Sequence, residues 1–351
     1  MNSRIGIPAL VAVAVVALVL AGAVGVLSGG PGPAGSTREV IIYTSVDQVY
    51  SEPVLRAFEG KTGIRVRAVY DVEAAKTTGL VNRLLAEKGN PRADVFWNGE
   101  IARTLVLKDA GILAPYRSPA AAGIPELYRD PESHWTGFGG RCRVILVNTR
   151  FLSASQYPRS LFSLANSSIP PERIGLAYPL FGTTATQAAA LYASLGPDKA
   201  RSFYVELKGK GIRLVDGNSV VRDLVVAGDL WAGLTDSDDA CGAVDGGAPV
   251  RVIIPDQGPG EAGTLVIPNS VALIAGAPHP QEGQLLIDYL LDPAVERELV
   301  LSGWFQLPLR PVDLPGSCLG GEVVRSMPVT FEEIARFQEQ SARDLAQIFI
   351  R

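Results

Sequence analysis

The sequence predicts an α/β protein built as two lobes with a ligand cleft between them. Strand-like segments alternate with amphipathic helical segments up to about residue 140, and the same alternation resumes after it. This order indicates parallel sheets covered by helices. The 351 residues are more than one ordinary domain needs. Two β-like stretches, 135–149 and 260–275, are candidates for strands that cross between the two sets of elements. Such a two-lobed protein can close on a ligand by hinge motion.

The first set of elements is predicted from periodicity. Glu39–Tyr43 is rich in β-branched residues, and Ala93–Trp97 is a short apolar run with two aromatic residues, so both read as buried strands. The helix at 73–88 has its apolar residues on one stripe. In order, the predicted elements are strand 39–43, helix 46–60, strand 64–70, helix 73–88, strand 93–97 and helix 100–108.

The second set continues the pattern. Its predicted strands are 143–148, 174–178, 212–215 and 230–234, and its helices are 181–195, 200–210 and 219–228. Strands at 264–267 and 270–275 and helices at 281–291, 294–302 and 331–348 follow. We therefore predict that 36–140 and 264–312 form lobe one, that 141–263 form lobe two, and that 313–351 pack on the lobes as a C-terminal segment.

The N-terminal segment predicts export. Arg4 precedes an uncharged apolar run from Ile5 to Leu27, which is about long enough to span a bilayer. Ala21-Gly22-Ala23 fits a small-x-small cleavage site, so a signal peptide and an uncleaved anchor both remain open. Residues 29–35 form a Gly/Pro tether, and residues 1–35 together precede the fold. Either alternative places the body in the periplasm or on the extracytoplasmic face of the membrane.

Composition argues against several classes of protein. The net charge of −4 disfavours a nucleic-acid partner. The two histidines, His134 and His279, are far apart, and there is no Gly-x-Ser-x-Gly, Ser-x-x-Lys or His-Glu-x-x-His motif. We expect no catalytic residues and no resident cofactor. Among Cys142, Cys241 and Cys318, one disulfide is possible, but the pair stays open and buried thiols fit equally well.

Polar residues follow the predicted strands, where ligands bind in parallel α/β sheets. Glu100 follows the strand at 93–97, and Ser45 follows the first strand. Thr183 and Thr184 lie at a helix N-terminus, which favours anions. The candidate ligand-binding residues are Ser45, Glu100, Arg141, Thr183, Thr184, Asn218 and Asp236.

Carboxylates in both lobes predict a cation site. Asp236, Asp238 and Asp239 form an acidic stretch after the strand at 230–234, and Glu100 lies in the other lobe. Hard cations such as ferric iron favour anionic oxygen ligands. The candidate metal ligands are Glu100, Asp236 and Asp238. The acidic stretch also fits a solvated turn, in which Asp is favoured.

Several of these segments together resemble the solute-binding proteins of ABC importers, and particularly the ferric-iron-binding group. The resemblance covers about residues 38–312. It rests on four segments, Val40–Ser45, Phe58–Ile64, Ala93–Glu100 and Thr136–Thr149, followed by Leu265–Ala275 before a helix at 285–291. It implies the type II periplasmic-binding fold, with hinge strands between the lobes, and a permease partner in the membrane.

The resemblance implies ligand residues only in part. The iron-binding relatives use a glutamate that matches Glu100, and adjacent tyrosines where this chain has Thr235–Asp238. Two ligands therefore stay open. One is ferric iron or a ferric-anion complex, and the other is a small anion such as a phosphonate, phosphate or carboxylate held by Ser45, Arg141, Thr183 and Thr184. In both cases we expect a monomer that carries its ligand as cargo.

Overall fold

The computed structural model describes residues 38–71, 78–304, 307–314, 318–319 and 324–349. The strands are β1 (Glu39–Thr44), β2 (Arg65–Tyr70), β3 (Val95–Asn98), β4 (Leu113–Ala114), β5 (Thr136–Asn148), β6 (Ile174–Ala177), β7 (Arg213–Val215), β8 (Ala232–Asp236), β9 (Val250–Ile253) and β10 (Val266–Ile274). The α-helices are α2 (Gln48–Thr62), α3 (Thr78–Ala86), α4 (Ile101–Asp109), α5 (Leu161–Ala165), α6 (Gly182–Leu195), α7 (Pro197–Lys210), α8 (Asn218–Ala227), α9 (Ser237–Asp245), α10 (Pro280–Leu290), α11 (Pro293–Leu299) and α12 (Phe331–Phe349).

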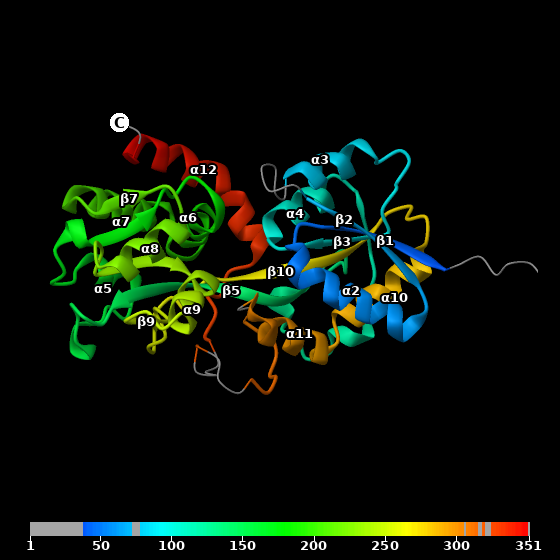
Figure 1. Cartoon of the computed structure of the whole chain (residues 1–351). Helices are drawn as coiled ribbons and strands as arrows, with labels where there is room; N and C mark the ends of the chain where they lie inside the picture. Colours follow the sequence, from blue (N-terminus) through cyan, green and yellow to red (C-terminus); the bar gives the residue numbers. More distant parts are fainter. Residues whose placement is uncertain (1–37, 72–77, 305–306, 315–317, 320–323, 350–351) are drawn as a thin grey trace, which may run out of the picture. The chain divides into compact units, whose positions relative to one another are not determined.

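The strands follow the order β2-β1-β3-β10-β5-β8-β6-β7, with β4 on β10 and β9 on β5. β1 pairs in parallel with β2 and β3, and β6 pairs in parallel with β7 and β8. The two parallel groups are linked by antiparallel pairing through β10 and β5 (Figure 1). We call β1–β4 with β10 and their helices the first lobe, and β6–β9 with theirs the second lobe.

β5 is the strand that passes from one lobe to the other. Its first part pairs with β10 as far as Cys142, and its second part pairs with β8 from Arg143 onward. The predicted crossing at 135–149 is therefore confirmed for one continuous strand. The predicted break between strands at 264–267 and 270–275 is wrong, because β10 runs through it with a register shift between Pro268 and Asn269.

Opposite this shift the backbone of β5 has an unusual conformation. Gly139 has φ of +52°, which a residue with a Cβ rarely adopts. Its N–H donates to the buried Glu296 carboxylate at 2.7 Å, and its carbonyl accepts from the Asn269 side chain at 3.3 Å. An irregularity of this kind bends a strand and re-aims the residues that follow. Arg141 comes two residues later.

The acidic stretch after β8 is helical rather than a turn. Asp236 ends β8, and Ser237 begins α9, with Asp238 and Asp239 in its first turn. Carboxylates in a first turn are stabilised by the free N–H groups and the helix dipole. The interpretation of this acidic stretch as a solvated turn is therefore wrong. Asp is favoured in turns as well as in the first turn of a helix, so the residue type fits both structures.

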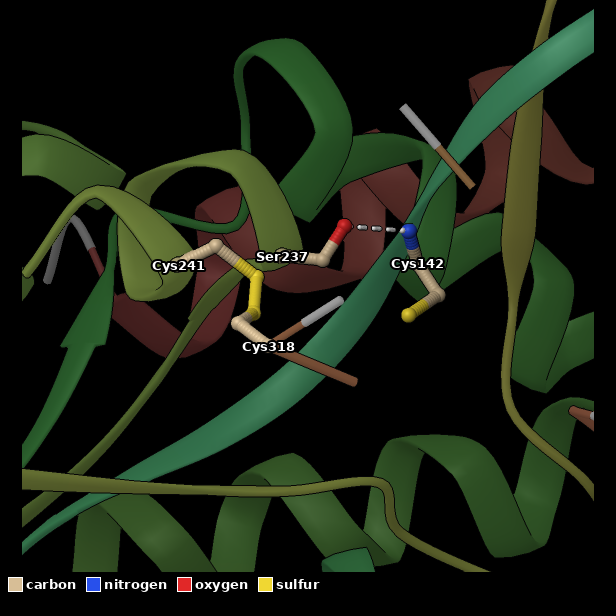
Figure 2. Close-up of a disulfide and its surroundings, with 4 residues drawn as sticks. All are labelled: Cys142, Ser237, Cys241 and Cys318. Atoms are coloured by element: carbon tan, nitrogen blue, oxygen red, sulfur yellow. Dashed lines mark hydrogen bonds between the residues drawn. A yellow bond between two sulfur atoms is a disulfide. The ribbon is translucent and has the colours of Figure 1, made fainter. Parts of the chain in front are cut away.

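The three cysteines divide into a disulfide and a thiol. Cys241 on α9 is bonded to Cys318, 77 residues later, with a Cα–Cα distance of 5.6 Å (Figure 2). Cys142 on β5 is free and buried. The Cys142 N–H donates to Ser237 Oγ at 3.0 Å, so β5 also contacts the first turn of α9 (Figure 2).

The helix α12 contacts α6, α7 and α4, so it packs on helices of both lobes (Figure 1). Phe331 at its start lies edge-on to Trp135, and Tyr192 of α6 donates to Asp344 at 3.0 Å. The described residues from Glu39 onward form one compact unit. The division at 140/141 and 263/264 stays a prediction.

Within the described ranges, no helix has both the length and the apolar character needed to cross a bilayer. The apolar run from Ile5 to Leu27, with its predicted cleavage site and tether, lies outside them.

Candidate ligand-binding site

A buried arginine organises the second-lobe half of the site. Arg143 lies where β5 joins β8, directly opposite Asp236, and its side chain is fully buried. An arginine in such a place must be paired and hydrogen-bonded, because desolvation of a lone charge is very unfavourable. Its hydrogen-bond acceptors are Gln187 Oε1 (3.0 Å), Thr183 Oγ1 (3.1 Å), Asn218 Oδ1 (3.0 Å), Asp236 Oδ1 (2.7 Å) and Thr184 Oγ1 (3.3 Å).

Asp236 is held from both of its oxygens. While Oδ1 faces Arg143, Oδ2 accepts from Thr183 Oγ1 at 2.6 Å and from Asn218 Nδ2 at 3.0 Å. The carboxylate is 4% exposed. A metal bound there would have to compete with an ion pair and two hydrogen bonds, so Asp236 serves to fix the ends of β8, α6 and α8 relative to one another.

In the first lobe, the corner after β3 is fixed by a similar network. Ser45 Oγ donates to Asn98 Oδ1 at 2.7 Å and accepts from the Gly99 N–H at 2.9 Å. Asn98 Nδ2 in turn donates to Thr104 Oγ1 at 3.1 Å. Ser45 and Asn98 are buried, so these bonds shape the loop that leads into α4.

Glu100 is the N-cap of α4. Its Oε1 accepts from the Ala102 N–H at 2.9 Å, which satisfies one of the free donors at the helix start. Burial raises the pKa of Glu100, and this effect is larger than the lowering by the Ala102 N–H and by the nearby Arg141. Burial of the carboxyl group therefore outweighs the attraction of the nearby Arg141 and Arg103 guanidiniums.

Arg141 joins the two halves. Its Nη2 donates to the Gly99 carbonyl at 3.2 Å in the first lobe, and its Nη1 lies 3.3 Å from Asp238 Oδ2 in the second. The side chains of Arg141 and Asp238 are 22% and 27% exposed, so the contact is only partly open to water. This one guanidinium connects the corner at Gly99 with the first turn of α9.

The carboxylates at the end of β8 and in the first turn of α9 are close enough to share a cation. Ligand oxygens of Asp236, Asp238 and Asp239 lie within 4.8 Å of one another. Burial raises the pKa of Asp238, and Arg141 only partly opposes this effect. Burial likewise raises the pKa of Asp239 to about 6, although Arg222 Nη1 donates to it at 2.9 Å.

Asp238 has one oxygen with no partner. Its Oδ1 is buried and accepts no hydrogen bond from any residue that the structure describes. An unsatisfied buried carboxylate oxygen is unfavourable, by about 1 to 3 kcal/mol or more. A cation or an N–H donor on a ligand would remove that penalty.

The predicted site residues divide into groups in the structure. Thr183, Thr184, Asn218 and Asp236 meet around Arg143, Ser45 lies against Gly99, and Arg141 contacts Asp238. Whether these residues bind ligand stays a prediction. Asn218 is the first residue of α8, after the N-cap Gly217, and its side chain donates to Thr183 and Asp236.

Arg143 was missed by the sequence reasoning. The signal available was an arginine directly before the apolar run Val144–Val147 in a predicted strand, since a charge in a buried strand needs a partner. The sequence does not show that Arg143 is the centre of the network, because this depends on the strand register that sets Arg143 opposite Asp236.

The fold is that of a two-lobed solute-binding protein, with polar residues gathered where the two α/β lobes meet. Residues 94–315 match the family of bacterial extracellular solute-binding proteins, and the chain belongs to that family.

Three relatives illustrate its range. The major ferric iron-binding protein of Neisseria meningitidis is 28% identical over 203 residues, which are 56% of this chain and 58% of that protein. A putative 2-aminoethylphosphonate-binding periplasmic protein of Salmonella paratyphi A is 26% identical over 263 residues, 72% of each chain. A Trichodesmium IdiA (FutA) structure in complex with iron and citrate has a TM-score of 0.79 at 21% identity, covering 89% of this chain and 100% of that one. The last similarity confirms the two-lobed fold.

Proposed function

We propose that the protein captures a ferric-anion complex outside the cytoplasm and delivers it to the permease of an ABC importer. The observation that carries the proposal is the buried, unpartnered oxygen of Asp238, in a cluster of carboxylates suited to a hard cation. The names of the Neisseria and Trichodesmium relatives support iron as the metal.

The charges of the site favour cargo that includes a positive centre. Carboxylates outnumber guanidiniums by one among the site residues, which are Glu100, Asp236, Asp238, Asp239, Arg141, Arg143 and Arg222. A simple dianion would meet an excess of negative charge. A bare ferric ion would be repelled by the Arg141 guanidinium, which lies beside Asp238.

An accompanying anion removes that difficulty. It would pair with Arg141 and with the N-terminus of α6, while the metal would take Asp238 and Glu100 as ligands. Thr183 and Thr184 begin that helix, whose first N–H groups attract negative charge. Asp236, which is held by Arg143, would then support the site without ligating the metal.

The test is titration of ferric citrate into iron-free protein from residue 36 onward, followed by calorimetry and thermal unfolding. A ligand that binds only the folded state stabilises it by about 2.7 kcal/mol at a hundredfold excess over Kd. Glu100→Gln and Asp238→Asn should each weaken binding more than tenfold. Asp198→Asn, an exposed carboxylate in the first turn of α7, is the matched control and should bind like the wild type.

Two results would refute the proposal. One is unchanged ferric citrate affinity in both cleft variants. The other is a strong visible phenolate-to-iron absorption band, since that band requires a tyrosine ligand, which this site does not include.

The second candidate is a small anionic solute such as a phosphonate. Arg141 and the α6 N-terminus favour it, as does the name of the Salmonella relative. Stabilisation by 2-aminoethylphosphonate or phosphate, with none by ferric citrate, would establish this alternative.

A further inference from the structure

A cavity with polar walls lies in the first lobe and shares no lining residue with the site described above. It has a volume of about 260 Å³ and is formed by the chain between β4 and the start of β5. That volume approaches the lower end of the range for small-molecule sites. The polar residues that border it and bear on its chemistry are Tyr116, Arg117, Ser118, Arg129, Ser133 and Thr136.

Arg129 gives the cavity an unmet hydrogen-bonding requirement. Its Nε is buried and donates to no residue that the structure describes. An arginine N–H that is removed from water without an acceptor is unfavourable by about 1 to 3 kcal/mol or more. Arg117 adds a second, exposed guanidinium at the same cavity. A planar guanidinium fork matches the oxygens of carboxylates and phosphates.

The nearby carboxylates do not neutralise these arginines. Asp130 is buried and is hydrogen-bonded by Lys108, by the His134 N–H at 2.8 Å and by His134 Nδ1 at 3.0 Å. Burial acts to raise the pKa of Asp130, but the bonds from Lys108 and His134 outweigh it and lower that pKa. Glu132 is 3.2 Å from Lys108 as well. Asp130 and Glu132 therefore already flank the Lys108 ammonium group, and His134 is bonded to Asp130, which argues against a metal ion there.

Glu126 is the remaining acid on the wall, and it is exposed. With Asp130 paired to Lys108, two guanidiniums face one free carboxylate. The cavity thus has an excess of positive charge, whereas the site between the lobes has an excess of negative charge.

The wall is fixed before any ligand arrives. Ser133 has φ of +65°, a conformation that is unfavourable for a residue with a side chain, and such positions concentrate at binding sites. It is held by two backbone bonds, from Tyr116 N–H to its carbonyl at 2.8 Å and from its own N–H to Asp130 O at 2.9 Å. Tyr116 and Ser118 are anchored by hydroxyl bonds to Asp288 of α10 at 2.8 and 2.6 Å.

We propose that this cavity is a second ligand site, which binds a small oxyanion, carboxylate or phosphate, between Arg129 and Arg117. The hydroxyl of Ser133 is available as a further donor at its wall. The site is independent of the proposed iron cargo, since its residues and its charge differ from those of the cleft.

The test is calorimetric titration of iron-free protein with malonate and, separately, with inorganic phosphate. We expect one of the two to bind at one equivalent. Arg129→Gln should lower its affinity at least tenfold and Arg117→Gln two- to fivefold, because Arg117 is the more exposed. Arg201→Gln, an exposed arginine on α7, is the control and should not change it.

A cleft variant separates this proposal from the proposed function. Glu100→Gln/Asp238→Asn should keep the malonate or phosphate binding, and Arg129→Gln should keep the ferric citrate binding. Three outcomes would each overturn the second site. Binding could persist unchanged in Arg129→Gln, or it could disappear in the cleft variant. The third outcome is that neither anion binds at an anion concentration tenfold above a Kd of about 1 mM, which is the weak end of the affinity scale.

Discussion

Replacing Arg143 by methionine tests whether the buried network holds the second-lobe half of the site together. Methionine keeps much of the volume but removes all five hydrogen bonds and leaves Asp236 without its counter-charge. Removal of one member of a buried ion pair typically destabilises a protein by about 3 to 5 kcal/mol. Because Arg143 is fully buried and Asp236 is 4% exposed, we expect a value in that range.

The assay is urea unfolding followed by circular dichroism, with ligand titration on the folded variant. The double variant Arg143→Met/Asp236→Asn should recover about 1 to 3 kcal/mol relative to Arg143→Met, since the amide can still accept from Thr183 without carrying a charge. Arg222→Met is the matched control. Arg222 pairs with Asp239 at 31% side-chain exposure, so its loss should destabilise by less than about 1 kcal/mol.

The reasoning would be refuted by either of two outcomes. One is a loss below about 1 kcal/mol in Arg143→Met, which would place the network outside the range for buried ion pairs. The other is strict additivity in the double variant, which would mean that Arg143 and Asp236 do not interact energetically.

Three further predictions concern stability. Replacing Cys241 by serine opens the 77-residue loop to Cys318 and should destabilise the oxidised protein by about 4 to 5 kcal/mol in chemical denaturation, while a reductant should change the wild type but not the variant. Gly211→Ala should destabilise by about 1 to 2 kcal/mol because φ is +81° there and an added Cβ would meet no other atom within 4 Å, whereas Gly209→Ala inside α7 should be neutral or stabilising, and equal effects would contradict the backbone argument. Since the pKa of Asp239 is raised from 3.8 to about 6, the folded state binds this proton more tightly, so its contribution to stability should rise as the pH falls from about 6 to 4. Asp239→Asn should flatten that part of the profile, and an unchanged profile would exclude the group as its source.

Much of the fold could be predicted from local pattern. β1, β2, β3, α2 and α4 lie within a few residues of their expected positions, because amphipathic periodicity or a short apolar run marks each of them in the sequence. Of the helix predicted at 73–88, the structure describes α3 (Thr78–Ala86), and residues 73–77 lie outside the described ranges. β9, at Val250–Ile253, was missed. It is a four-residue strand on β5 with a mixed burial pattern, so its formation depends on a partner distant in sequence.

The candidate site was predicted less completely, for a related reason. The residues after strands could be listed because strand ends are visible in the sequence. Which of them contact one another depends on register, and a shift of one residue would turn Arg143 away from Asp236. The disulfide between Cys241 and Cys318 likewise depends on distances that no local pattern contains.

The place of β10 in the sheet has a consequence for synthesis. β3 is flanked by β1 on one side and by β10 on the other, and β10 is made only after the whole second lobe. Until it emerges, β3 keeps an open edge of unpaired N–H and carbonyl groups, which can pair with another chain. The second lobe pairs with the first only through β5, and β5 is made before β6–β9. We therefore expect the second lobe to form first and the nascent first lobe to be the aggregation-prone intermediate, so that substitutions in β10 should reduce the yield of soluble protein more than their effect on final stability would suggest.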